Sequence, residues 1–110
     1  MLIELRQYVV EPGTHDLMHR LFAEEIIPLF HAHGMNPANF WVPAEETDPG
    51  GFEFVYTLSF QDMTDHDTKW AAFLADPAWL DIRERAGSPP PWKKVVKSFL
   101  APVPYKTSTA

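Results

Sequence analysis

Residues 52–60 read Phe-Glu-Phe-Val-Tyr-Thr-Leu-Ser-Phe, and this stretch decides the fold class. Its aromatic and apolar side chains fall at every second position, which is the period of a β-strand. An acidic, Pro-Gly-Gly loop at 44–51 precedes it, and a short apolar segment at 39–43 precedes that loop. We therefore predict a β-hairpin made of strands 39–43 and 52–60.

The chain before this hairpin has the pattern of a strand followed by a helix. Residues 2–10 alternate between two faces until Pro12 and Gly13 form a turn. Thr14 is a suitable N-cap, and from there apolar residues recur with a helical period to about residue 33. Pro28 removes a backbone donor within this pattern, so we expect the helix to kink or divide near residue 27.

The second half of the chain repeats the helix and the strand. We expect a helix from Asp62 or Thr64 to about 75, a short helical piece at 76–85, a break at 87–91 and a strand at 92–101. The order β-α-β-β-α-β predicts an α+β, ferredoxin-like sandwich with helices on one face of a four-stranded sheet. We assign residues 1–105 to this single domain and 106–110 to a polar tail.

If the sheet face without helices is apolar, we expect another molecule to bury it. We expect this face to carry aromatic residues such as Tyr8, Trp41 and Phe54 or Tyr56, which would form a large exposed patch in a monomer. A second copy of the chain would cover the patch, sheet against sheet. We therefore predict a homodimer through the helix-free face, closed into a dimeric α/β barrel.

Composition excludes several classes of function. The net charge of −6 and the nine Lys and Arg residues argue against nucleic acid as a partner. The densest basic run, Lys93, Lys94 and Lys97, is interpreted as an exposed strand face. The absence of cysteine excludes disulfides and thiol chemistry, and no long apolar span or signal-like segment is present. We predict a cytoplasmic protein that does not enter a membrane.

Several separated stretches resemble the NIPSNAP family. They are the opening Glu4-Leu5-Arg6-x-Tyr8 with Pro12-Gly13, the helix end Leu29 to Gly34, the element Ala75-Asp76-Pro77-Ala78-Trp79, and the closing Leu100-x-Pro102-x-Pro104-Tyr105. The resemblance runs nearly end to end and implies the dimeric α/β-barrel fold, which antibiotic-biosynthesis monooxygenases also use. It implies no settled activity. Many members of the family carry a His and a Trp on the third strand where this chain has Tyr56 and Leu58, so a pocket built on that His is not expected.

Glu4, Arg6 and Tyr8 are the candidate catalytic residues, because they share one face of the first strand. In the predicted dimer that face points into the barrel interior. Arg6 could hold an anionic or carbonyl ligand, Glu4 could move a proton, and the Tyr8 hydroxyl could donate to an oxyanion. The alternative is that Glu4 and Arg6 pair with each other, or across the dimer, as a structural network.

The candidate ligand-binding residues are Arg6 and Tyr8 together with an aromatic wall of Trp41, Phe54 and Tyr56. Packing in the core or the dimer interface is the alternative role of these rings. The chain contains no phosphate-binding glycine loop, dinucleotide fingerprint or nucleophile elbow, so no cofactor is predicted.

The remaining titratable residues give weaker signals. His15 and His19 are one helical turn apart and could share a metal ion, but a third ligand is missing from the pattern, so no metal is predicted. We interpret His66 as exposed, because Asp65 and Asp67 flank it. Glu25 falls on the apolar side of the first helix, where we interpret it as structural.

Two hypotheses about function follow. In the first, the barrel interior of a dimer binds a small, partly apolar organic ligand and converts it, if at all, without a cofactor. In the second, the protein is a non-enzymatic dimer with a filled barrel that engages another protein. The first predicts that Arg6→Ala weakens ligand binding and leaves the dimer intact. A metal-dependent enzyme ranks last.

Overall fold

The computed structural model describes residues 1–107, which form one sheet and one layer of helices. In chain order the elements are β1 (Leu2–Val10), α1 (His15–Leu21), the π-helical turn η1 (Phe22–Ile26), α2 (Ile27–Ala32), β2 (Asn36–Trp41), β3 (Phe54–Phe60), α3 (Met63–Ala75), α4 (Pro77–Ala86) and β4 (Trp92–Leu100). The predicted order β-α-β-β-α-β is confirmed, with each helical region divided into shorter pieces.

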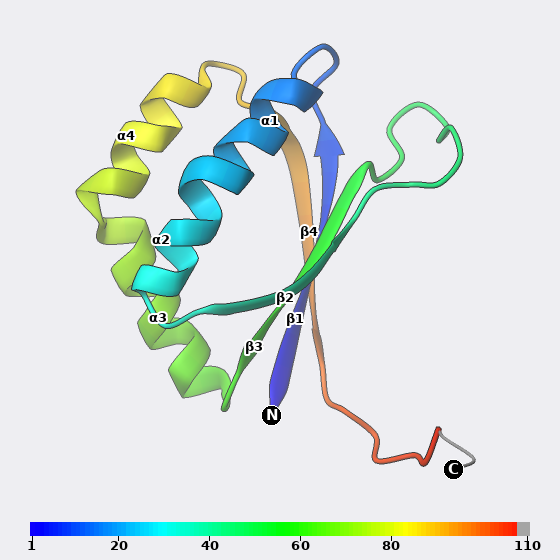
Figure 1. The fold of residues 1–110 in the computed structure, drawn as a ribbon, viewed down its shortest axis with the longest axis vertical. Coiled ribbons are helices and arrows are strands. Elements are labelled where there is room, and N and C mark those ends of the chain that lie inside the picture. The colour runs from blue at the N-terminus through cyan, green and yellow to red at the C-terminus, as the bar shows by residue number, and fades with distance from the viewer. Residues whose placement is uncertain (108–110) are drawn as a thin grey trace.

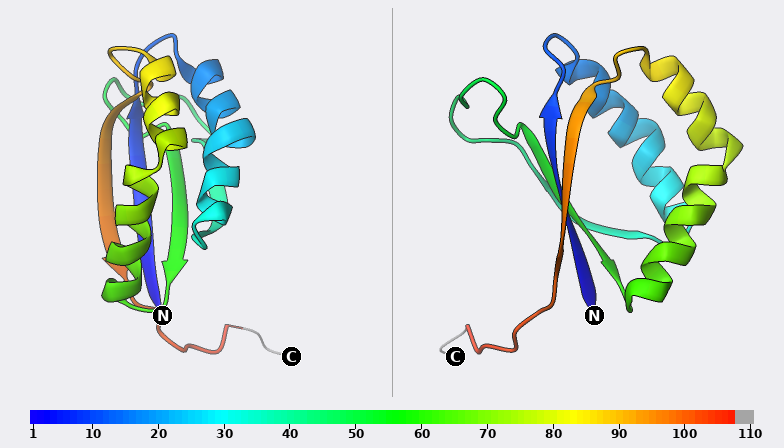
Figure 2. Two further views of the ribbon diagram at one scale, coloured as in Figure 1. Left: turned by 90° about the vertical axis from the view of Figure 1, so that its left-hand side faces the viewer. Right: turned by 180° about the vertical axis from the view of Figure 1, so that it is seen from behind.

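The four strands pair in the order β2-β3-β1-β4, and every pair is antiparallel. This is the ferredoxin-like arrangement. In the described residues 1–107, all helices lie on one side of the sheet, and no layer covers the other side (Figures 1 and 2). The α+β prediction is therefore confirmed for one chain.

Pro28 shapes the first helical region as the sequence predicts. The helix runs without interruption from α1 through η1 into α2, and Pro28, near the start of α2, has no N–H to donate to the preceding turn. The wider turn of η1 comes directly before it. Thr14 precedes α1, but its hydroxyl donates to the Glu11 carbonyl (2.7 Å) and does not cap the helix.

The second helical region depends on two aspartate caps. Asp62 accepts a hydrogen bond from the backbone N–H of Asp65 at the start of α3 (2.8 Å). Asp76 accepts from the N–H of Ala78 at the start of α4 (2.8 Å), and Pro77 occupies the first turn. A side-chain acceptor at this position satisfies a backbone donor that the helix leaves free.

The hairpin is confirmed, but its first strand begins earlier than predicted. β2 begins at Asn36 and includes Pro37, which an edge strand tolerates because its outer side needs no donor. The register shifts between Pro37 and Phe40, after which Phe40 pairs with Tyr56. Residues 42–53 form the loop, so β3 begins at Phe54.

The assignment of sheet faces was wrong for Tyr8, Phe54 and Tyr56. These rings point toward the helices and are buried, and the Tyr8 and Phe54 rings both meet Phe22 of η1 edge to face. The same face of β1 carries Glu4 and Arg6. Large aromatic side chains fill the space between a sheet and a helix layer. The side chains at the odd-numbered positions of β1, on the other face, are smaller. Burial of ring volume therefore decided the orientation.

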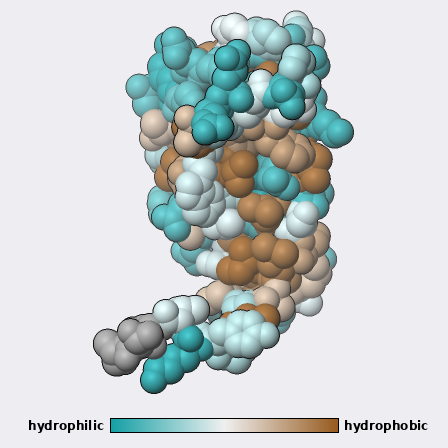
Figure 3. Space-filling view, turned by 90° about the vertical axis from the view of Figure 1, so that its right-hand side faces the viewer, coloured by the Kyte–Doolittle hydropathy of each residue, from teal (hydrophilic) through white to brown (hydrophobic). Residues whose placement is uncertain are grey.

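Among the paired strand residues, the helix-free face combines aliphatic and polar side chains with one aromatic side chain. Trp41 lies there, opposite Val55, and is 49% exposed. Figure 3 shows apolar side chains gathered along the middle of this face. By strand register, its apolar members are Ile3, Leu5, Val9, Trp41, Val55, Val96 and Leu100.

The chain leaves the sheet after β4 and projects to its helix-free side, in an exposed and irregular conformation over 101–107 (Figure 1). The predicted tail at 106–110 lies outside the described residues from 108 onward. None of the helices formed by residues 1–107 has the length and apolarity needed to span a bilayer. The cytoplasmic location stays a prediction.

Candidate functional site

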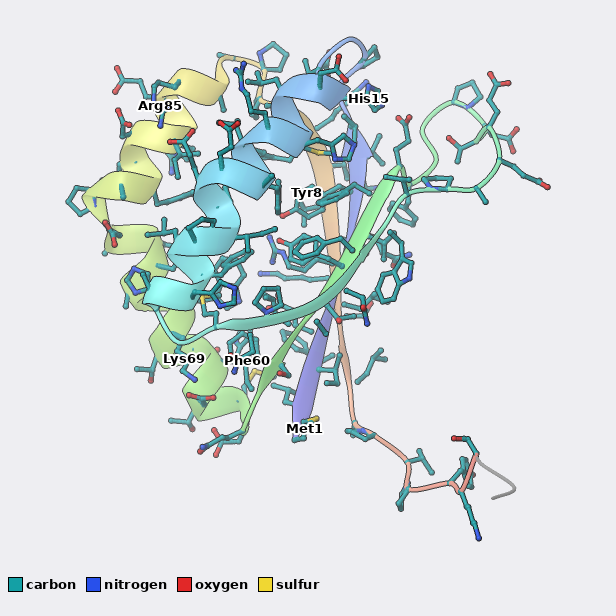
Figure 4. The ribbon with its side chains drawn as sticks, in the orientation of Figure 1. Met1, Tyr8, His15, Phe60, Lys69 and Arg85 are labelled. Atoms are coloured by element: carbon teal, nitrogen blue, oxygen red, sulfur yellow. The ribbon has the colours of Figure 1, made fainter. Side chains whose placement is uncertain are left out.

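The three helix-facing polar residues of β1, Glu4, Arg6 and Tyr8, meet partners from β3 and α3 beneath the helix layer. In Figure 4, Tyr8 lies between the first helical region and the sheet. Tyr56 of β3 is directly opposite Arg6 in the strand register. Because β1 is an inner strand of the sheet, its helix-facing side chains have a neighbouring strand on each side and the helix layer above them.

Glu4 is a fully buried carboxylate with three donors. Its Oε2 accepts from Arg6 Nη1 (3.0 Å). Its Oε1 accepts from the indole N–H of Trp70 (2.7 Å) and from Nε2 of His66 (3.1 Å). A buried carboxylate is tolerated only with such compensation. The predicted pairing of Glu4 with Arg6 is therefore observed, within one chain.

The Arg6 guanidinium donates hydrogen bonds to three side chains. Besides Glu4, its Nε donates to the Tyr56 hydroxyl (3.0 Å) and its Nη2 to the Tyr8 hydroxyl (3.4 Å). The guanidinium also lies over the Trp70 ring, 4.6 Å from the centroid. Burial by itself lowers the pKa of Arg6, but the facing Tyr56, Tyr8 and Glu4 outweigh it, so this pKa lies above its usual value. Arg6 is a permanent cation.

Tyr8 and Tyr56 form a hydroxyl pair with an oxygen–oxygen distance of 2.8 Å. Burial raises the pKa of the Tyr56 hydroxyl well above its usual value, and the adjacent Tyr8 adds to the rise. Tyr56 is therefore a neutral donor at physiological pH. A cation and two hydroxyls in one cluster can stabilise negative charge on a carbonyl or carboxylate oxygen.

A cavity of about 90 Å³ lies beside this cluster, between the sheet and the helices. Arg6, Tyr8 and Tyr56 line one side of it. The other walls are apolar and come from η1, α2, α3, α4 and β4: Phe22, Ile26, Phe30, Trp70, Phe73, Leu74, Trp79, Trp92 and Val95. Leu74 is 51% exposed, so the cavity reaches the surface at α3.

The prediction for His66 was wrong, and the sequence did not single out Trp70 for the polar cluster. His66 is 8% exposed and lies between Glu4 and Asp67, whose Oδ1 is 2.8 Å from its Nδ1. It also packs against Phe60 and Phe99. The flanking aspartates suggested a surface position. In the helix, however, successive residues point in different directions, and His66 faces the sheet while Asp67 is exposed. The four-residue spacing of His66 and Trp70 was the available signal.

Trp41 does not belong to this site. It faces away from the helices, on the opposite side of the sheet from Arg6. Phe54 is on the correct face, but it is 3% exposed and packs in the core against Tyr8 and Phe22. The candidate aromatic wall is therefore divided between two faces.

The other titratable candidates have structural contacts. His15 is 2.8 Å from the Glu53 carboxylate, and His19 lies edge-on to Phe54. Among residues 1–107 no three His, Asp or Glu side chains converge as metal ligands do. Glu25 is partly exposed and pairs with Arg85 of α4, at the outer end of that helix in Figure 4, which is a structural role as predicted.

Comparison with known proteins identifies relatives of the whole chain. The NIPSNAP family model matches residues 3–106. No curated protein is detectably similar in sequence.

Solved structures share the fold. A NIPSNAP family protein of unknown function from Agrobacterium tumefaciens has 20% identity and a TM-score of 0.80, over 97% of this chain and 92% of that one. An uncharacterized NIPSNAP domain protein from Burkholderia xenovorans has 18% identity and a TM-score of 0.80, over 98% and 100%. A putative antibiotic biosynthesis monooxygenase from Nitrosomonas europaea has 13% identity and a TM-score of 0.64, over 94% and 99%.

Proposed function

Because the chain belongs to the NIPSNAP family and encloses a buried Arg–Tyr cluster beside an aromatic cavity, we propose that it binds a small, partly apolar organic molecule in that cavity. The observation that carries the proposal is the position of the Arg6 guanidinium, which lines a cavity whose other walls are mostly aromatic. The site lies under the helices of one chain, and not between two sheets.

The size and lining of the cavity define the ligand. A volume of about 90 Å³ is below the roughly 150 Å³ of an engineered cavity that takes up benzene, so the ligand has about one ring and the walls yield to admit it. Leu74, at the surface, is a wall that can yield. The aromatic lining favours a planar ring, and Arg6 with the tyrosine hydroxyls favours an oxygen acceptor on it.

The test is a titration with benzamide, followed by NMR of the indole N–H groups in nitrogen-labelled protein. Trp70, Trp79 and Trp92 line the cavity, whereas Trp41 lies on the other face of the sheet. Binding in the cavity shifts the first three signals and leaves the fourth unchanged. If benzamide moves none of the three, or moves Trp41 equally, the proposal is wrong.

Variants at the cavity mouth sharpen this test. Leu74→Trp fills the opening from an exposed position, so it should weaken benzamide binding without unfolding the protein. Leu80→Trp is the matched control, because Leu80 is similarly exposed on α4 and does not line the cavity. Arg6→Ala removes the cation but also leaves Glu4 without its partner, so Tyr8→Phe is the gentler variant of the polar cluster.

A second candidate is the non-enzymatic homodimer joined through the helix-free sheet face. Two observations favour it: Glu4 and Arg6 pair within one chain, and the helix-free face carries an exposed strip of apolar side chains. Lys94 is the charged residue that the strand register puts on this face. A surface that meets its own copy benefits from low charge, because identical charges would repel. A dimeric barrel and ligand binding are compatible.

A further inference from the structure

Lys97 adds a second cation beside the cavity. It lies on β4 directly opposite Arg6 of β1, on the helix-facing side of the sheet. Residues opposed in this way have Cβ atoms about 5 Å apart. Arg6 is largely buried, whereas Lys97 is exposed, so one cation lies at the cavity wall and the other at the neighbouring surface.

Of these two cations, only Arg6 has a carboxylate partner among residues 1–107. Like charges directly opposite each other on a sheet are destabilising. Glu4 pairs with Arg6, but none of the ion pairs formed among residues 1–107 includes Lys97. The helix-facing surface of β4 therefore has a positive charge that an incoming anion would stabilise.

The cavity reaches the strand that carries this charge. Val95 lines the cavity and shares its face of β4 with Lys97, two positions along the strand. Inside, Arg6 uses its Nε and one N–H on each terminal nitrogen. One N–H on Nη1 and one on Nη2 therefore have no acceptor among residues 1–107, and they remain able to donate to a carboxylate.

From this geometry we propose that the ligand is a small aromatic anion of the aryl carboxylate class. Lys97 determines the preference for negative charge, and Arg6 receives the carboxylate. This inference rests on the proposed function, because it names the class of molecule that the same cavity takes. It also gives a function to a lysine that composition alone assigned to a solvated strand face.

Benzoate and benzamide test the inference, since they share one ring and nearly one size and differ in charge at neutral pH. Dissociation constants are measured at low salt from the indole N–H signals of Trp70, Trp79 and Trp92. The wild-type protein should bind benzoate about fivefold more tightly, as one favourable charge interaction of about 1 kcal/mol gives. Added salt should reduce that preference.

Lys97→Gln should abolish the preference for benzoate and leave the dissociation constant of benzamide unchanged. Lys94→Gln is the matched control, with the same loss of charge on the same strand but on the helix-free face. Both side chains are exposed, so both variants should fold.

The outcomes separate two failures. Equal affinity of the wild-type protein for both probes, a preference that survives Lys97→Gln, or an equal loss in Lys94→Gln overturns the anion inference and leaves the cavity in place. If neither probe binds, the proposed function itself is overturned.

Discussion

The indole N–H of Trp70 donates to the Glu4 carboxylate at 2.7 Å, although the two residues are 66 positions apart. Glu4 lies near the start of β1 and Trp70 lies in the middle of α3, so this bond joins the sheet to the helix layer. The same carboxylate holds Arg6 at the wall of the cavity. The candidate site and the packing of the helix layer therefore depend on one buried carboxylate.

Glu4→Gln should destabilise the fold by about 3 kcal/mol, because it leaves the buried Arg6 cation without its partner. Urea unfolding at neutral pH measures this change. Glu24→Gln, an exposed carboxylate in η1, is the control and should change stability by less than about 0.5 kcal/mol. Equal stabilities of the two variants would show that Glu4 does not hold the network.

Tyr56→Phe should cost about 2 kcal/mol, since it removes the hydroxyl that accepts from Arg6 Nε and pairs with Tyr8. It should also change the response to alkali. Because the folded-state pKa of Tyr56 is raised, its contribution to stability is complete below the unfolded value of about 10 and is lost as pH rises through the folded value. Unfolding free energies measured on both sides of pH 10 should fall more steeply for the wild-type protein than for the variant.

Asp76→Asn should remove part of the acid sensitivity of the fold. The backbone N–H of Ala78 and then the His33 side chain lower the pKa of Asp76 below its usual value. Its stabilising effect is therefore present above the unfolded pKa of about 4 and is lost as pH falls through the folded value. Asparagine keeps the cap without the charge, so the stability difference between wild type and variant should shrink between pH 6 and pH 3. Asp48→Asn, in the exposed 42–53 loop, should show no such convergence.

Val55→Lys tests the proposed dimer. Val55 is on β3 and faces the helix-free side beside Trp41. Two lysines brought together at an interface of identical copies repel, so sedimentation at low micromolar concentration should find a dimer for the wild-type protein and a monomer for the variant. Leu80→Lys, on the exposed side of α4, should remain dimeric. A wild-type protein that sediments as a monomer would contradict the dimer and the barrel together.

Local signals in the sequence were sufficient for the elements and their order. Alternation marked residues 2–10 and 52–60 as strands, the aspartates at 62 and 76 marked helix starts, and Pro28 marked the division of the first helix. These signals work because they involve neighbours in the chain. The ends of β2 were misplaced because an edge strand with a bulge has a weak alternation.

Sequence by itself also determined that Glu4, Arg6 and Tyr8 share one face of one strand, since a period of two requires it. It did not determine which layer that face would meet. Alternation defines two faces and is symmetric between them, so only the packing of the Tyr8, Phe54 and Tyr56 rings against the helices assigned the polar residues to the inside of one chain. The helix layer then supplied Trp70 and His66 to Glu4, and with them the cavity, because contacts between distant segments form only when the layers pack.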